Sequence, residues 1–211
     1  ATEYGATAPQ LGNVENVSED CLFLNIWTPG LADGGNRPIM VYFHGGAYAS
    51  GSGSSPLYDG TNLATKGDVV VITVNHRLNA FGYLSLSRLN KDFPHSGNAG
   101  MWDLVLALEW IRDNAAAFGG DPSRVFVFGQ SGGGAKIATL MAAPSARGLF
   151  HSAATMSGQQ VTACGPLSGQ LRAQAYLDTL GIAPEDTTAL RAAPVETLID
   201  ALATRDPVNP E

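Results

Sequence analysis

The stretch VFVFGQSGGG, residues 125–134, decides the fold. Its first four residues are apolar without alternation, which is typical of a strand covered on both faces, as in a parallel sheet. Glycines then surround Ser131, and the residues from Gly132 to Ala142 favour a helix. A strand, a glycine-rich turn and a helix in this order predict one unit of an α/β sheet, with the serine at the turn.

Other segments of the chain extend this pattern in both directions. Short runs rich in β-branched and aromatic residues predict strands at residues 22–27, 39–43, 69–74 and 153–156. Apolar residues from Leu104 to Phe118 recur with a period near 3.6, which predicts a helix that ends at Gly119 and Gly120. We therefore expect an α/β fold with a partial, mainly parallel sheet and flanking helices.

The chain changes character near residue 164. No linker divides it, but the residues from Leu167 onward are rich in alanine and have helical spacing at Leu167, Leu171 and Ala175. We expect residues 1–163 to form part of the α/β core, and residues 164–211 to form a helical segment that begins a cap or regulatory region.

Composition excludes several classes of protein. The 211 residues include 25 glycines and 45% apolar residues, without a repeat, so the chain is expected to be globular. A net charge of −7 and the absence of a basic run argue against a nucleic-acid partner. Its longest apolar run is too short for a membrane span, and Cys21 and Cys164 lack zinc-site spacing.

These observations also bear on cofactors and localisation. We expect no metal and no cofactor. Because no apolar run is long enough for a membrane span, a soluble protein is expected, either cytoplasmic or secreted. Nothing at Ala1 resembles a signal peptide.

Eleven of the 25 glycines fall in two windows, residues 45–60 and 119–134, and each window adjoins the end of a predicted core strand. The second window contains the pattern G-x-S-x-G. Its turn is so sharp that side chains at Gly129 and Gly133 would collide with the strand and the helix. The same turn lifts the hydroxyl of Ser131 clear of the sheet, beside the N-terminal amides of the following helix.

A phosphate-binding loop is an alternative interpretation of this window. Gly129 to Gly134 has the spacing G-x-x-x-x-G, but Ala135 comes before Lys136, and Ile137 stands where a Mg²⁺-binding serine or threonine is needed. A dinucleotide fingerprint at residues 51–56 fails as well, because Pro56 replaces its third glycine.

The first window favours acyl transfer. Attack of a serine on a carbonyl group creates an oxyanion, which needs backbone N–H donors from a neighbouring loop of small residues. His44, Gly45, Gly46 and Ala47 form such a loop directly after the predicted strand 39–43. Two such turns predict a serine hydrolase, with a non-catalytic relative of the same fold as the alternative.

Five sequence blocks, in order, resemble the carboxylesterase/cholinesterase family, also called type-B carboxylesterases, which has the α/β-hydrolase fold. They extend over most of the chain: SEDCLFLNIWTP (18–29), NHRL (75–78) with FGYLS (81–85), ALEWIRDN (107–114) with FGGDP (118–122), ARGLF (146–150) and SG (157–158).

The resemblance implies a carboxylic-ester hydrolase with a Ser-Glu/Asp-His triad and a small-molecule ester as substrate. It makes Ser131 the nucleophile, which forms an acyl-enzyme intermediate. It also places the backbone N–H groups of Gly46, Ala47 and Gly132 in the oxyanion hole.

This chain departs from the family pattern at four positions beside the expected site. Gln130 replaces the usual glutamate, which removes a charge near the triad. Gly132 replaces the usual alanine, a mild change because only its backbone donates, and Ala47 replaces a third glycine. Ala49 is small where larger side chains narrow the entrance. With these residues, Tyr48 is a further candidate to line the pocket.

The triad acid and histidine have no candidate in this chain. The triad order is serine, acid, histidine, yet the single histidine after Ser131 is His151, which precedes every later acid. Both partners are expected beyond Glu211, so the chain is interpreted as the central segment of a longer enzyme whose N-terminal and C-terminal parts are missing. We expect this segment alone to be poorly stable and to have little activity.

Two predictions remain from the resemblance. The cysteine that matches Cys21 in animal relatives is disulfide-bonded to one that would lie before Ala1, so here a free, buried thiol is expected. The alternative function is a catalytically silent adhesion or interaction module, but such modules usually lose the nucleophile, whereas Ser131 and its flanking glycines are intact.

Overall fold

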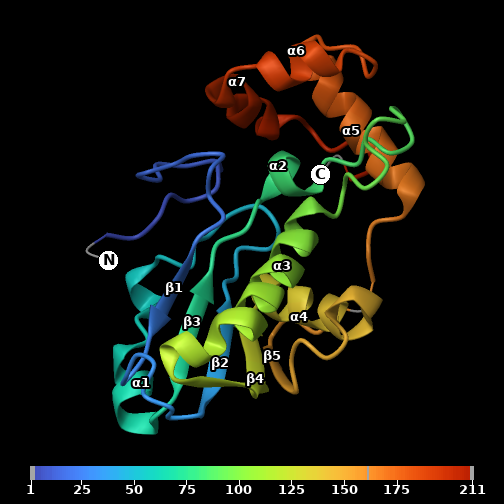
Figure 1. The fold of residues 1–211 in the computed structure, drawn as a ribbon. Coiled ribbons are helices and arrows are strands. Elements are labelled where there is room, and N and C mark those ends of the chain that lie inside the picture. Colours follow the sequence, from blue (N-terminus) through green and yellow to red (C-terminus); the bar gives the residue numbers. More distant parts are fainter. Residues whose placement is uncertain (1–2, 161, 210–211) are drawn as a thin grey trace.

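A computed structural model describes residues 3–160 and 162–209. Its sheet has five strands within these residues, in the order β1-β3-β2-β4-β5 (Figure 1). All pairs are parallel except β1 with β3, which is antiparallel. The strands are β1 (Leu24–Trp27), β2 (Arg37–Phe43), β3 (Val70–Val74), β4 (Gly120–Gln130) and β5 (Ser152–Met156).

Every predicted strand is present, and the prediction of a mainly parallel sheet is confirmed. The largest difference is at β4, which begins at Gly120 instead of residue 125. Gly120 pairs with Arg37, and the register shifts before Ile39 pairs with Val125. Residues 122–124 are exposed, so their polar sequence gives no strand pattern.

Two helices cover one face of the sheet, and the main hydrophobic core lies between these helices and the strands. Helix α3 (Ala99–Asn114) continues into a 3₁₀ turn, η2 (Ala115–Phe118), and Gly119 ends it with a left-handed φ of 68°. Helix α4 (Gly132–Ala142) lies beside α3 and packs on β2, β4 and β5 (Figure 1). Both helices match the prediction, because their buried leucines and isoleucines recur every three or four residues against the sheet.

Four shorter helices connect these elements, and the sequence pattern did not reveal them. They are η1 (Pro56–Tyr58), α1 (Thr61–Gly67), α2 (Asn79–Tyr83) and η3 (Pro144–Ala146). Each has seven residues or fewer, which is too short to show a helical period.

The C-terminal residues form a separate helical layer at one end of the molecule, beyond α2 (Figure 1). It consists of α5 (Pro166–Leu180), α6 (Thr187–Ala192), α7 (Val195–Asp200) and η4 (Ala201–Ala203). Leu177 packs with Leu86, and Tyr176 packs near Phe81, so the layer rests on residues of the preceding segment. The proposed division into residues 1–163 and 164–211 stays a prediction.

The two cysteines differ in environment. Cys21 is free and fully buried, and burial raises the pKa of its thiol to about 11, whereas Cys164 is free and exposed. In the described part of the chain, no helix is both long and apolar enough to pass through a membrane.

Candidate active site

Ser131 occupies a strained turn between β4 and α4. Its φ of 54° and ψ of −122° are unusual for a residue with a side chain. The serine stands at the N-cap of α4, but its hydroxyl makes no capping hydrogen bond. Its backbone N–H donates to the carbonyl of Met156 at 2.8 Å, and its carbonyl accepts from the N–H of Ala135 at 3.0 Å. The sheet and the helix thus hold the strained backbone in place.

The glycines that flank Ser131 permit this turn, as the sequence predicts. A Cβ atom on Gly129 would lie 2.7 Å from the carbonyl oxygen of Phe43, at the end of β2. A Cβ atom on Gly133 would collide with the same oxygen and would lie 3.0 Å from that of His44. Neither position has space for a methyl group, because both neighbours are backbone atoms.

The loop after β2 reaches the same place. Because β2 and β4 are adjacent and parallel, their carboxyl ends lie at one edge of the sheet. The loop turns with left-handed φ angles of 88° at Gly46 and 54° at Ala47, and the carbonyl of Gly46 accepts from the N–H groups of Ala49 and Ser50. A Cβ atom on Gly132 would lie 2.6 Å from the nitrogen of Ala47. An alanine at position 132 would therefore collide with the loop in this structure, so the exchange of the family's usual alanine for glycine is not sterically neutral.

Three backbone amides remain available at this junction. Within the described residues, the N–H groups of Gly46, Ala47 and Gly132 donate no hydrogen bond to the protein. The amide of Gly132 also lies at the positive end of α4. The arrangement can stabilise a small anion or an oxyanion next to the hydroxyl of Ser131.

Behind the loop, two histidine rings are buried and stacked. His44 and His76 are 1% and 0% exposed, and their ring centroids are 4.7 Å apart. Each Nδ1 lies within hydrogen-bond distance of a backbone carbonyl, that of Gly45 at 2.8 Å and that of Arg77 at 3.0 Å. Burial lowers the pKa of His44 to about 4 and that of His76 well below its ordinary value, with a smaller effect from Lys136. Both rings are therefore neutral near pH 7.

Lys136 is the functional candidate that the sequence reasoning missed. It is 0% exposed, its Nζ donates to the carbonyl of His44 at 3.3 Å, and Nζ lies 5.4 Å from the ring centre of Tyr48. Burial lowers the pKa of this amine to about 7. The sequence feature that could have identified Lys136 is its position four residues after Gly132, which puts both residues on the same face of the helix.

The predicted pocket-lining residues surround this junction in different ways. The ring of Tyr48 is half-buried and meets the ring of Tyr83 edge-on at 5.0 Å. Ala49 and Gln130 are exposed, and Gln130 is the last residue of β4, directly before Ser131. Contact of these three residues with a substrate stays a prediction.

His151 lies far from Ser131. Its Nδ1 accepts from the backbone N–H of Val125, and its own N–H donates to the carbonyl of Val125. Val125 and Ser131 are six positions apart along the chain, with five residues of β4 between them, roughly 20 Å of extended chain. This position agrees with the interpretation that His151 is not the triad histidine.

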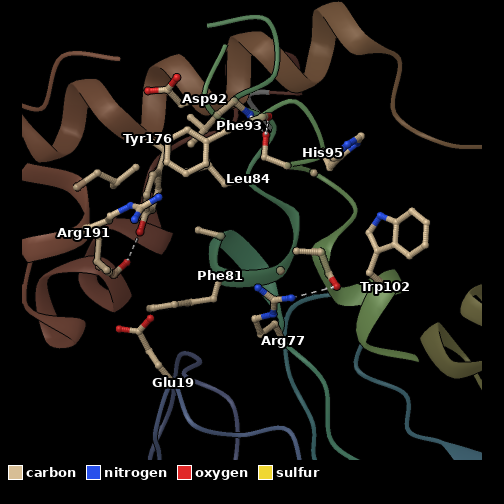
Figure 2. Close-up of a pocket in the computed structure, with 18 of the residues that line it drawn as sticks. Glu19, Arg77, Phe81, Leu84, Asp92, Phe93, His95, Trp102, Tyr176 and Arg191 are labelled. Carbon is tan, nitrogen blue, oxygen red and sulfur yellow. Dashed lines mark hydrogen bonds between the residues drawn. The ribbon is translucent and has the colours of Figure 1, made fainter. Parts of the chain in front are cut away.

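A cavity lies elsewhere, between α2 and the C-terminal helices. It measures about 580 Å³. Figure 2 shows Phe81, Leu84, Phe93, Tyr176 and other side chains around it. Neither Ser131 nor the loop that follows β2 lines this cavity. The candidate nucleophile therefore stands outside it.

Comparison with known proteins identifies the relatives of the chain. Residues 1–209 match the model of the carboxylesterase family. The chain is 43% identical over 209 residues to the para-nitrobenzyl esterase of Bacillus subtilis, covering 95% of this chain and 42% of that protein. It is 49% identical over 144 residues to human carboxylesterase 3, covering 68% of this chain and 24% of that protein.

Solved structures agree with these relatives. The crystal structure of the carboxylesterase EST55 of Geobacillus stearothermophilus at pH 6.2 matches with a TM-score of 0.93 and 42% identity, over 99% of this chain and 44% of that one. The chain thus spans less than half the length of these relatives. With the α/β-hydrolase architecture and the turn at Ser131, these matches show that the chain belongs to the carboxylesterase family.

Proposed function

We propose that this chain carries the nucleophile and the oxyanion hole of a serine carboxylic-ester hydrolase. The observation that carries the proposal is the convergence of two turns at one edge of the sheet. The strained turn holds Ser131, and the loop after β2 brings Ala47, which follows Gly46, against Gly132. Within the described residues, the amides of these three residues donate no hydrogen bond to the protein. This is the arrangement that acyl transfer through a serine requires.

The chemistry then follows in two steps. The Oγ of Ser131 attacks the ester carbonyl carbon while a general base takes its proton, and the carbonyl oxygen becomes an oxyanion held by the three amides. The C–O bond to the alcohol breaks, the alcohol leaves with that proton, and an acyl-enzyme remains. Water attacks this acyl group in the same way, which releases the acid and restores Ser131.

The proposal assigns the general base to a part of the protein outside this chain. A histidine and an acid after Glu211 would complete the triad, in the order typical of this fold. The rest of the enzyme is thus a necessary partner of residues 1–211, and we expect the segment alone to have little activity. Relatives named para-nitrobenzyl esterase and fumonisin B1 esterase support an ester as the substrate class.

The test uses the protein at its full natural length, with p-nitrophenyl acetate as substrate. Ser131→Ala should abolish hydrolysis, and a fluorophosphonate should label Ser131 in the unsubstituted protein, as found by peptide mass spectrometry. Ser145 is exposed in η3, so Ser145→Ala is a matched control that should keep full activity. Hydrolysis that survives Ser131→Ala contradicts the proposal, and a protein without hydrolysis or labelling would fit the non-catalytic interaction module instead.

A further inference from the structure

Lys136 connects the helix that follows the nucleophile with the loop after β2. Its Nζ donates to the carbonyl of His44 and lies over the ring of Tyr48. His44 and Tyr48 stand on either side of Gly46 and Ala47 in the sequence. One side chain of α4 therefore contacts the loop on both sides of its two free amides.

The position of this amine is costly, and no ion pair offsets the cost. In residues 3–160 and 162–209, no carboxylate forms a salt bridge with Lys136. The groups beside it are the neutral rings of His44 and His76 and the ring of Tyr48. An apolar side chain would avoid the desolvation of the amine. A buried, unpaired lysine at a functional junction is typical of a residue kept for its role.

We propose that Lys136 is a positioning residue that holds the loop of residues 44–48 so that its amides face the hydroxyl of Ser131. This inference rests on the proposed ester hydrolysis. Lys136 acts through the carbonyl of His44 and the ring of Tyr48, and it does not itself contact the substrate.

Substitution of Lys136 is expected to weaken stabilisation of the transition state more than binding of the substrate. The loop amides bind the oxyanion far more strongly than the neutral carbonyl of the bound ester, so a displaced loop weakens binding of the transition state most. Loss of the contacts that Lys136 makes with the loop should therefore lower kcat and leave KM nearly unchanged. A role in stability alone would change neither constant of the folded enzyme.

The experiment compares Lys136→Met with the unsubstituted protein at full natural length. Methionine has nearly the same length and no donor. With p-nitrophenyl acetate, kcat per fluorophosphonate-titrated site should fall at least tenfold, and KM should change less than threefold. Affinity for a trifluoromethyl ketone, which forms a tetrahedral adduct on serine, should fall by the same factor as kcat/KM. Lys66 is exposed in α1, and Lys66→Met is the control that should leave all three values unchanged.

The outcomes separate this inference from the proposed function. If the unsubstituted protein lacks hydrolysis that depends on Ser131, the proposed function fails, and the inference fails with it. If that hydrolysis is present and folded Lys136→Met keeps its kcat, only the inference is overturned. If Lys136→Met does not fold, Lys136→Gln replaces it, since its amide is one bond too short to reach the carbonyl of His44. A folded Lys136→Gln with unchanged kcat overturns the inference equally.

Discussion

Gly133 lies directly against the carbonyl group of Phe43, the last residue of β2, and the two leave no space for a methyl group. The contact joins the first turn of α4 to a central strand that is paired on both sides, by β3 and by β4. Phe43 cannot move without breaking sheet hydrogen bonds, and Gly133 cannot move without distorting the start of α4. The contact therefore fixes the distance between the helix and β2, and with it the place of Ser131.

Gly133→Ala should therefore destabilise the protein and reduce its hydrolysis of esters. We expect a loss of about 3 kcal/mol in the free energy of unfolding, the upper part of the range for overpacking, since backbone atoms cannot rotate away. Urea denaturation and the kcat for p-nitrophenyl acetate measure the two effects. Gly165→Ala is the control, because Gly165 has no atom within 4 Å of an added Cβ. Equal unfolding free energies for the two variants would refute the steric argument.

The strained backbone of Ser131 gives a second prediction, which concerns stability. A φ of 54° with a ψ of −122° costs a residue with a Cβ about 1–3 kcal/mol, whereas glycine adopts it freely. Ser131→Gly should be more stable than Ser131→Ala by about 1 kcal/mol, after the larger chain entropy of glycine is subtracted. Both variants should be inactive. The comparison uses denaturant midpoints, and an alanine variant as stable as the glycine variant would show that the turn relaxes.

The sequence predicted the elements that build the site because they follow a strong period or a steric rule. The buried strand Val70–Val74 and the helix Gly132–Ala142 have the predicted type, and the first differs from its expected bounds by one residue. The glycines beside Ser131 have the steric role that the pattern G-x-S-x-G implies. Local sequence is sufficient at these places, since each constraint acts over a few residues.

Features that depend on distant contacts were not predictable. The antiparallel direction of β1 is set by its pairing with β3, almost fifty residues later. The burial of His76 and Lys136 arises where three segments, from β2, β3 and α4, meet. A polar residue in a helix is ordinarily expected at the surface, and only the fold puts Lys136 under the loop.

The buried amine of Lys136 predicts a pH dependence of stability. Its pKa is about 7 in the folded protein, against 10.5 for an exposed lysine. Between these values the unfolded chain binds a proton that the folded protein does not, so stability rises with pH by at most about 1.4 kcal/mol per unit. Below pH 7 both states are charged, and the full cost of burying the charge is present.

Lys136→Met removes this cost, so its stability advantage over the unsubstituted protein should be largest near pH 6.5 and should shrink toward pH 9.5. His44 and His76, which face the amine, titrate below this window, and the ring of Tyr48 is the other neighbour. Urea denaturation of both proteins at pH 6.5, 8.0 and 9.5 measures the difference. An advantage that is constant over this range would mean that the amine is not desolvated.

The ion pair of Arg77 and Asp103 gives the last prediction. The carboxylate of Asp103 is 3% exposed and accepts from the backbone N–H of Arg77 at 2.9 Å and from its guanidinium at 2.6 and 2.9 Å. The ion pair joins the segment between β3 and α2 to helix α3. Asp103→Asn should cost about 3 kcal/mol of unfolding free energy, because the guanidinium loses its counter-charge and one of the part-buried donors of Arg77 loses its acceptor. Asp113→Asn breaks the exposed pair with Arg112 and should cost less than about 1 kcal/mol. Denaturant unfolding of both variants at pH 7 measures the two losses. Similar small losses of unfolding free energy would mean that the pair of Arg77 and Asp103 behaves as a surface contact.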